Sequence, residues 1–383
     1  MKISPCAAAI EPTLIRALRE RAGPESIDLG LGQPDLPVSE AVRDAMMREL
    51  QGPTYAPYSA NAGLWETREA VARHEGALPE EVLVTCGVQQ GLAVALLGLV
   101  EAGDEVLVPD PGFPAYPNLV RAAGGTPVPY GLRPGEQGWT LDPAAIAAAI
   151  SEKTKLIILN SPSNPTGGIH GKAELSEVLE ALAERDIAWL SDEIYEDYVY
   201  DGAVHVSPRD FVDHLGRGIK LSGLSKSHHM MGWRLGWMVG PADLIRELTP
   251  LHQHLVTCAP TLVQRAAIAA LGDHYPTRTR TLAIFNERRN LAIAGCHGLD
   301  GVSFANPCGA FYLFADVRGM LGPNQFVTEL AYNILREVDV ITIPGAGFGP
   351  GGEGFLRIAY TVESKKVVEG LERVRHYFDT LDP

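Results

Sequence analysis

The sequence predicts an α/β fold with a large domain, built on a mostly parallel sheet flanked by helices, and a smaller α+β domain. The chain has 383 residues, too many for one compact core, because single cores stop growing at about 250–300 residues. Short apolar runs alternate with helical patterns over most of the length, which is typical of a parallel sheet covered on both faces. After about Leu271 the pattern changes to shorter, mixed units.

Two helices are expected before the first strand of the large domain. Ser39 can cap the first of them, because its hydroxyl accepts a backbone hydrogen bond. Val42, Met46 and Leu50 then lie on one face at four-residue spacing. The second helix is expected over residues 64–75.

The strands of the large domain are expected as short apolar runs. The first spans residues 82–85 and ends at Gly87, and the helix after it, 92–100, is apolar on all sides and should be buried. The other predicted strands are residues 105–108, 126–130, 155–159, 187–190, 219–222 and 236–239, with helical patterns such as 143–150 and 173–184 between them. Because sites on parallel sheets lie at the carboxyl ends of the strands, we expect the functional side chains just after these runs.

The last part of the chain is expected to form the small domain. It begins with one long helix, residues 277–294, and continues with strands at 311–316, 340–343 and 354–361 and helices at 326–337 and 365–377. We expect the N-terminal stretch to pack with it. The predicted division is therefore 49–275 for the large domain, and 1–48 with 276–383 for the small one.

Composition excludes several classes of protein. Hydrophobic residues make up 46% and charged residues 21%, which excludes a disordered chain or a fibre. Lys and Arg total 32 against 47 Asp and Glu, and a net charge of −15 argues against a nucleic-acid partner. The five cysteines are scattered with no Cys-x-x-Cys pair, which argues against a zinc site and a disulfide scaffold and favours a reducing compartment. With no run of membrane-span length and no signal peptide, we expect a soluble, cytoplasmic protein without a metal.

Side chains that can do chemistry follow three of the predicted strands. Asn164 comes after one, Asp192 and Tyr195 after the next, and Lys226 after a third. Each has an ordinary explanation when taken alone, because Asn-Pro is common in turns, Asp caps helices and loop lysines are usually solvated. Their coincidence at successive strand ends favours one catalytic mouth that holds all of them.

These groups together suit one kind of chemistry. An amine can form an imine with an aldehyde cofactor. A carboxylate that faces a pyridine nitrogen keeps it protonated, so that the ring can accept electrons. A phenol and an amide can hydrogen-bond the oxygen of the ring. This is the constellation that pyridoxal 5'-phosphate requires.

The sequence resembles the class I/II aminotransferases of fold type I, the aspartate aminotransferase superfamily, over nearly the whole chain. The most specific motif is Ser222-Gly223-Leu224-Ser225-Lys226 followed by Gly232-Trp233-Arg234-Leu235-Gly236, which resembles the family's lysine signature. The resemblance implies ping-pong transfer of an amino group from an L-amino acid to a 2-oxo acid. Lys226 would form the Schiff base and later shuttle the proton, and Arg234 would bind the phosphate.

The resemblance assigns further residues to the cofactor. Asn164 and Tyr195 match the residues that hydrogen-bond its phenolic oxygen, and Asp192 matches the carboxylate at the pyridinium nitrogen. Gly87-Val88-Gln89 matches the phosphate-binding turn, where the backbone N–H groups of a helix N-terminus suit an anion. Phe113 matches the aromatic residue that stacks on the ring.

The resemblance also implies a substrate site and a partner subunit. Arg357 matches the arginine that holds the substrate α-carboxylate, with Asn164 beside it, and Gly32 matches the N-terminal segment that folds over the substrate. Tyr55 matches the tyrosine that reaches the phosphate of the neighbouring subunit. The expected assembly is a homodimer with shared active sites.

The sequence departs from the family pattern in three places. Many members place a phosphate-binding Ser three residues before the lysine, where this chain has Gly223, so Ser222 or Ser225 would have to substitute. The pair His228-His229 is unusual, and we expect one to be a pocket wall and the other to be solvated. No second arginine for a substrate side chain can be placed; the candidates near the N-terminal segment are Arg16, Arg19 and Arg21.

Two alternatives stay open at this stage. A C–S or β-lyase, or another eliminase, would use the same lysine, Asp192 and Arg357, since all these reactions deprotonate Cα; release of pyruvate or ammonia would distinguish them. A sensor that binds the cofactor without turnover is a member of another class. Only some 30 residues precede Gly32, with no helix-turn-helix, which argues against a regulator. No Gly-x-Gly-x-x-Gly opens the first strand–helix turn, which argues against a nicotinamide enzyme.

Overall fold

The main body of the protein is a sheet of eight strands in the order β2-β9-β8-β7-β6-β3-β4-β5. The structure is a computed structural model that describes residues 2–10, 12–52, 57–135 and 138–381. Pairing is parallel from β8 to β4; it is antiparallel where β9 meets β2 and β8 and where β5 meets β4. The strands are β2 (Val82–Thr85), β3 (Glu105–Asp110), β4 (Thr126–Gly135), β5 (Gly138–Leu141), β6 (Thr154–Asn160), β7 (Ala188–Asp192), β8 (Gly218–Gly223) and β9 (Gly236–Val239).

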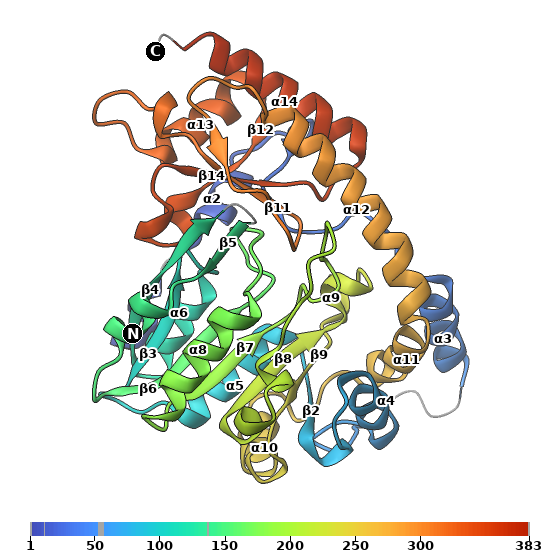
Figure 1. Cartoon of the computed structure of the whole chain (residues 1–383). Coiled ribbons are helices and arrows are strands. Elements are labelled where there is room, and N and C mark those ends of the chain that lie inside the picture. Colours follow the sequence, from blue (N-terminus) through green and yellow to red (C-terminus); the bar gives the residue numbers. More distant parts are fainter. Residues whose placement is uncertain (1, 11, 53–56, 136–137, 382–383) are drawn as a thin grey trace.

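Helices cover both faces of this sheet, in the lower half of Figure 1. One face packs against α5 (Val88–Leu99), α6 (Ala115–Ala122) and α10 (Ala242–Val256). The other face packs against α7 (Pro143–Ala149) and α8 (Lys172–Ala183). At the β2–β9 end it packs against α3 (Glu40–Gln51), α4 (Trp65–Glu75) and α11 (Thr261–Gly272). The mostly parallel α/β prediction is therefore confirmed.

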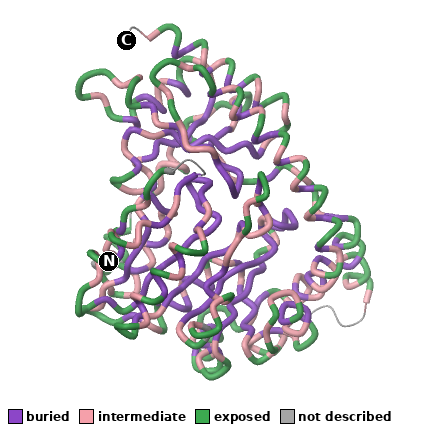
Figure 2. Tube along the Cα trace, in the orientation of Figure 1, coloured by how far each residue is buried: buried purple, intermediate pink, exposed green. Residues whose placement is uncertain are grey.

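The alternation of side chains along each strand explains why two cores form. On β6, Leu156 and Ile158 belong to the core under α5, whereas Ile157 and Leu159 belong to the core under α8. Side chains in a strand point to opposite faces in turn, so a strand that is apolar at every position must be covered on both sides. Figure 2 shows the resulting concentration of buried backbone in the strands.

The small domain contains a four-stranded antiparallel sheet in the order β10-β11-β14-β13. A separate parallel pair joins the N-terminal segment, through β1, to β12. The long helix α12 runs along one side of the molecule from the large domain to the small one (Figure 1). The strands are β1 (Ile27–Asp28), β10 (Ser303–Phe304), β11 (Tyr312–Asp316), β12 (Val340–Ile341), β13 (Ile343–Pro344) and β14 (Phe355–Ala359), and the helices are α12 (His274–Cys296), α13 (Val327–Val338) and α14 (Ser364–Asp379).

Several details differ from the elements that the sequence predicts. The helix expected over residues 92–100 is α5, which begins at Val88. The strand expected over residues 340–343 is two short strands, β12 and β13, which pair in different sheets. Strand β5 was not expected; it folds back on the end of β4, and its Trp139 side chain is buried against the small domain. The apolar run 340–343 does not reveal from its sequence that its pairing partners change halfway along it.

The N-terminal part of the chain divides between the two packing units. Leu18, Ile27 and Leu29 lie in the core of the small domain, near the short helix α2 (Leu14–Arg19); α1 (Pro5–Ala8) precedes it. Val42 of α3 lies instead in the core that contains α11. The division into 1–48, 49–275 and 276–383 stays a proposal, and the packing of α3 favours a first boundary before Ser39. In the described part of the chain, no helix is long and apolar enough to cross a membrane.

Candidate active site

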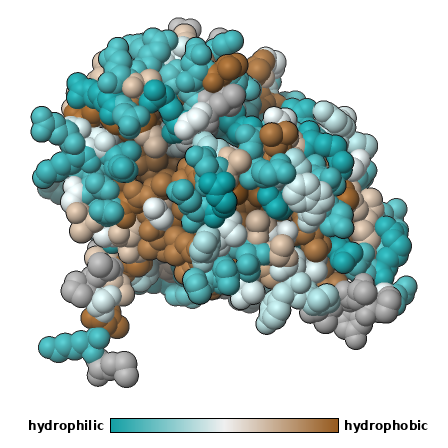
Figure 3. All heavy atoms as spheres, turned by 90° about the horizontal axis from the view of Figure 1, so that it is seen from below, coloured by the Kyte–Doolittle hydropathy of each residue, from teal (hydrophilic) through white to brown (hydrophobic). Residues whose placement is uncertain are grey.

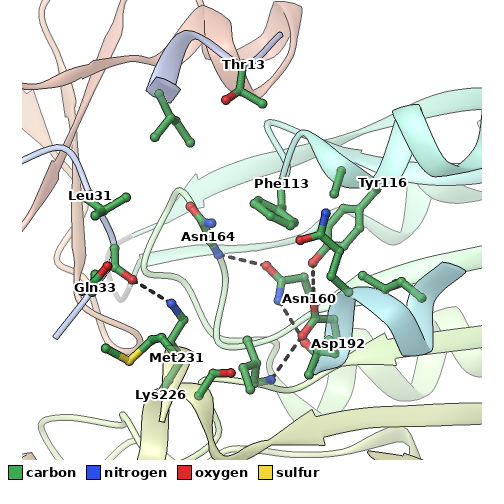
Figure 4. Close-up of a pocket in the computed structure, with 18 of the residues that line it drawn as sticks. Thr13, Leu31, Gln33, Phe113, Tyr116, Asn160, Asn164, Asp192, Lys226 and Met231 are labelled. Carbon is green, nitrogen blue, oxygen red and sulfur yellow. Dashed lines mark hydrogen bonds between the residues drawn. The ribbon is translucent and has the colours of Figure 1, made fainter. Parts of the chain in front are cut away.

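A cavity of about 800 Å³ lies at the carboxyl edge of the large sheet, beneath the N-terminal segment and the small domain. It brings together most of the residues that the sequence singled out, as Figure 4 shows in part. The predicted residues that line it are Gly32, Val88, Gln89, Phe113, Asn164, Asp192, Tyr195, Ser225, Lys226, Arg234 and Arg357. Gly87 lies directly before Val88 at the same turn, and Tyr55 lies outside the described residues.

Lys226 lies on the helical turn α9 (Leu224–Ser227), directly after β8. Its Nζ reaches the N-terminal segment and donates to the carbonyl oxygen of Gly32 at 2.7 Å. Burial, together with the positive charges of Arg357 and Arg234, lowers the pKa of Lys226 to about 8. The amine is therefore neutral, and nucleophilic, in a larger fraction of molecules than an exposed lysine would be.

Asp192 ends β7 at the floor of the cavity and is 4% exposed. The Tyr116 hydroxyl donates to its Oδ2 at 2.9 Å, and the Ile194 N–H donates to its Oδ1 at 3.3 Å. Burial raises the pKa of Asp192 to about 6, although both hydrogen bonds act in the opposite direction. A buried carboxylate of this kind gains from a cationic N–H partner in the cavity.

Two asparagines connect this floor to the upper wall. Asn160, at the end of β6, donates through Nδ2 to the backbone oxygen of Asp192 at 2.9 Å. Its Oδ1 accepts the backbone N–H of Asn164 at 2.9 Å, as the dashed lines in Figure 4 show. The Asn164 Oδ1 in turn accepts from Arg357 Nη1 at 2.8 Å.

Arg357 projects from β14 of the small domain and is 1% exposed. Its guanidinium lies between two rings, 4.5 Å from the centroid of Tyr312 and 4.6 Å from that of Phe348. Nη2 donates to the Gly30 carbonyl, while Nε has no partner among the described residues. Arg357 lines the cavity, and a planar cation held in this way suits a carboxylate ligand.

The opposite end of the cavity is suited to an anion. Gly87, at φ 82°, turns the chain from β2 into α5, so that the first N–H groups of a twelve-residue helix are directed there. Arg234 lies against this turn: a Cβ on Gly87 would be 2.7 Å from Arg234 Nη2. A phosphate would meet a helix N-terminus and a guanidinium at this point.

The choice between the two candidate serines follows from their contacts. Ser222 Oγ donates to Glu196 Oε1 at 2.6 Å, and Ser222 is not among the residues that line the cavity. Ser225 does line it. Of the two, Ser225 is the hydroxyl in position to substitute at the phosphate end.

Sequence reasoning missed three residues of the site: Tyr116, Asn160 and Tyr312. Asn160 had a usable signal, since it directly follows the strand predicted over residues 155–159. Tyr116 stands three residues after Phe113, one helical turn on, and the two rings meet edge to face at 5.6 Å. Tyr312, whose hydroxyl is 2.9 Å from that of Tyr195, comes from the small domain, and no local pattern connects it to the sheet.

The expectation for the histidine pair is wrong. His228 is 1% exposed and His229 is 8% exposed, so neither is solvated, and neither is among the residues that line the cavity. His228 Nδ1 lies 2.8 Å from Ser227 Oγ, and His229 Nδ1 lies 3.1 Å from the Pro37 carbonyl. The His228 ring lies 5.5 Å from the ring of His274, and His229 Nε2 lies 3.4 Å from Thr281 Oγ1, so both imidazoles pack toward α12.

Two of the three candidate arginines reach the cavity. Arg16 and Arg19, on α2, line its outer wall. Arg19 also lies 3.8 Å from Asp28. Arg21 is not among the lining residues and its guanidinium lies 4.5 Å from the ring centroid of Tyr332.

The donor set fits pyridoxal phosphate. The cavity offers a buried amine, a buried carboxylate with a raised pKa, an aromatic wall at Phe113 and an anion site at Gly87 and Arg234. The Arg357 guanidinium, which also lines the cavity, remains for a carboxylate of the substrate.

The comparisons with known proteins agree with this geometry. The family described as aminotransferase class I and II matches residues 24–374. The aspartate aminotransferase of Pyrococcus horikoshii is 34% identical over 377 residues, which are 95% of this chain and 94% of that protein. The structure is similar to the aspartate aminotransferase from Thermus thermophilus with maleate (TM-score 0.90, 30% identity, 98% of this chain and 99% of that one). It is also similar to the aromatic aminotransferase from P. horikoshii (TM-score 0.87, 30% identity, 95% and 98%).

Gly223→Ser should destabilise the protein instead of supplying a phosphate ligand. A Cβ at this position would lie 2.7 Å from Gly236 Cα and 2.9 Å from the Leu235 carbonyl, both on the paired strand or just before it. We expect a loss of about 1–3 kcal/mol, measured by thermal or urea unfolding. Gly131→Ser, on β4 of the same sheet, has no atom within 4 Å of the added Cβ and is the control. A free energy of unfolding of Gly223→Ser equal to that of wild type would show that the added side chain is not crowded at this position.

Proposed function

The chain belongs to the class I and II aminotransferases, enzymes that move amino groups between amino acids and 2-oxo acids, and we propose that it does so with pyridoxal phosphate held by Lys226. The observation that carries the proposal is that Lys226, Asp192 and Arg357 meet in one cavity, although they come from three distant parts of the sequence. Pyridoxal phosphate, when bound, supplies an aldehyde that reacts with amines and a ring that accepts electrons.

The residues of the large domain would hold the cofactor. Lys226 supplies the amine, and Asp192 holds a proton on the ring nitrogen. Asn164 and Tyr195 hydrogen-bond the phenolic oxygen, and Phe113 covers the ring. The phosphate would be bound by the helix N-terminus at Gly87, Val88 and Gln89, with Ser225 and Arg234 beside it.

The residues of the small domain and the N-terminal segment would hold the substrate. Arg357 binds the α-carboxylate through its planar guanidinium, fixed by the two rings and by Asn164. Gly32 lies over the amine, and its carbonyl accepts a hydrogen bond from Lys226. Lys226 Nζ, neutral above its lowered pKa of about 8, then takes and returns the proton at the substrate Cα.

We further propose a homodimer in the cytoplasm. Tyr55, the residue expected to reach the partner's phosphate, lies outside the described residues, so this part depends on the sequence resemblance. A hollow of about 370 Å³ is lined by Pro57, Tyr58 and Val256, and by Cys86, next to the phosphate turn. Figure 3 shows apolar side chains gathered across the middle of the lower face of the molecule, which suits a self-complementary interface. The cytoplasm is favoured by the scattered cysteines.

Lys226→Ala should remove the visible absorbance of the lysine-linked cofactor. It should also lower the turnover rate by roughly 10²–10⁴-fold or more. The reason is that no other lysine lines the cavity among the described residues. Borohydride reduction of the wild type followed by peptide mass mapping should place the cofactor on Lys226. Lys155→Ala, an exposed lysine of β6, is the control. Cofactor found on another lysine would refute the assignment.

Arg16 should bind an acidic substrate side chain, because it lines the outer wall of the cavity. Arg19 lines it too, but its guanidinium already lies near Asp28. Arg16→Met should raise KM for aspartate by about tenfold or more, since a charged hydrogen bond contributes about 1.5–3 kcal/mol, and should leave alanine nearly unchanged. Arg21→Met, outside the cavity, is the control. The assay pairs each donor with 2-oxoglutarate and with pyruvate, and monitors ammonia to detect elimination. An equal rise in KM for aspartate and for alanine would show that Arg16 does not bind the substrate side chain.

Light scattering should give a mass of twice 41.2 kDa. Mixing the inactive Lys226→Ala with a Tyr55→Phe variant should restore part of the activity, because one site of each mixed dimer then has both residues intact. A fully active monomer, or demonstrated mixed dimers that recover nothing, would remove the shared site and leave the lysine chemistry unaffected.

A further inference from the structure

A compact group of buried charges lies behind the floor of the cavity, and the proposed chemistry does not use it. At its centre is Lys220, on β8, which is 5% exposed. Its Nζ lies 2.5 Å from Glu196 Oε2, 2.7 Å from Glu75 Oε2 and 3.4 Å from Glu193 Oε2. One ammonium group therefore contacts three carboxylates.

The carboxylates are held from the outside by further hydrogen bonds. Glu75, at the end of α4, accepts from Trp237 Nε1 at 2.7 Å. Glu193 accepts from Ser207 Oγ at 2.7 Å and lies 2.8 Å from His205 Nε2. Glu196 accepts from Ser222 Oγ at 2.6 Å. This network, which we name the Lys220 cage, joins α4, the turn after β7, β8, β9 and the loop around His205.

The cage holds three carboxylates around one ammonium, so Lys220 offsets their mutual repulsion. Burial acts to lower the pKa of Lys220, but Glu196, Glu75 and Glu193 outweigh it and hold that pKa well above its ordinary value. Burial raises the pKa of Glu196 to about 7. For Glu193, Lys220 and His205 outweigh burial and lower the pKa to about 2. The titratable groups that face the cage are Glu75, Glu193, Glu196, His74, His170 and His205.

Lys220 occupies the place that a metal ion would take. Among the described residues, His74, Glu75 and Glu196 have metal-ligand spacing, and so do Glu193, Glu196 and His205. The ammonium nitrogen lies within 3.4 Å of the three carboxylates in these two groups. A cation is thus already built into the chain at this point, and no added ion is required.

The members of the cage alternate with the residues of the proposed active site. Glu193 follows Asp192 directly, and Glu196 follows Tyr195 directly. Ser222 stands four residues before Lys226 on the same β8–α9 segment. Fixing the cage therefore fixes the backbone that presents the carboxylate, the phenol and the amine.

We propose that Lys220 is a positioning residue whose ammonium, in place of a metal ion, holds together the two segments that carry Asp192, Tyr195 and Lys226. This inference rests on the proposed function of those three residues. The charge and its contacts are the operative features, since the lysine does not line the cavity.

Removing the ammonium should make the site depend on pH. In Lys220→Met, the buried carboxylates can stay together only if Glu196 takes up a proton, so the pKa of Glu196 in the folded state rises further above its unfolded value. Stability from a group with a raised pKa is present at low pH and is lost as pH rises through the folded pKa. The variant should therefore be close to wild type at pH 6 and impaired at pH 8.5.

The experiment compares full-length wild type, Lys220→Met, Lys220→Met/Glu196→Gln and the exposed-lysine control Lys155→Met between pH 6 and 9. The readouts are the pyridoxal phosphate dissociation constant from visible absorbance and the unfolding temperature of cofactor-free protein. We expect Lys220→Met to bind the cofactor roughly tenfold more weakly at pH 8.5, one unit of pKa being a factor of ten, and less than about threefold more weakly at pH 6. The double variant, with one negative charge fewer, should recover most of the loss at pH 8.5, and Lys155→Met should follow wild type.

Two results would overturn the proposal. One is cofactor binding by Lys220→Met that equals wild type at every pH. The other is a loss of the same size at every pH that Glu196→Gln does not repair, which includes failure of both variants to fold. If Lys220→Met alone fails to fold and the double variant folds, the role of the charge is supported. The unfolding temperatures need no bound cofactor, so they separate a failure of this proposal from a failure of the Lys226 assignment.

Discussion

The guanidinium of Arg357 joins three parts of the chain that are far apart in the sequence. It extends from β14 of the small domain, bonds Asn164 at the edge of the large sheet and bonds the carbonyl of Gly30 in the N-terminal segment. Its two ring contacts, to Tyr312 and Phe348, keep it in place without using its Nε. The walls of the cavity therefore meet at one cation, and a carboxylate ligand would complete the same set of contacts that holds the walls together.

The residues at the sheet edge could be predicted because their signals are local. A run such as 155–159 is apolar at every position, which requires cover on both faces, and the polar residues that follow it must then stand at the edge. Asn164, Asp192 and Lys226 were found in this way, and the lysine motif supplied Arg234. The cavity brings them together with Arg357.

What the sequence did not reveal depends on contacts between distant segments. Tyr312 reaches Tyr195 only because β11 of the small domain faces the sheet. Residues 340–343 look like one strand, yet Thr342 separates two strands with different partners. The charges of the Lys220 cage were not singled out from the sequence, because nothing in a lone lysine, or in two glutamates three residues apart, indicates that these side chains are buried. Lys220 and Lys226 are six residues apart, yet their pKa values shift in opposite directions: burial lowers the pKa of Lys226, whereas three carboxylates outweigh burial and raise that of Lys220.

The antiparallel direction of β9 has a consequence for how the site is inherited. Because β9 runs against β8, its first residue, Gly236, pairs with Gly223 at the carboxyl edge of the sheet. Strand β8 ends and strand β9 begins at this same edge, so the short segment between them carries both Lys226 and Arg234 at the cavity, and no helix has to cross the sheet. The amine and the guanidinium are therefore encoded within nine consecutive residues, 226–234. Insertions and deletions should be excluded from this stretch of the gene, whereas they can accumulate in the long crossovers elsewhere.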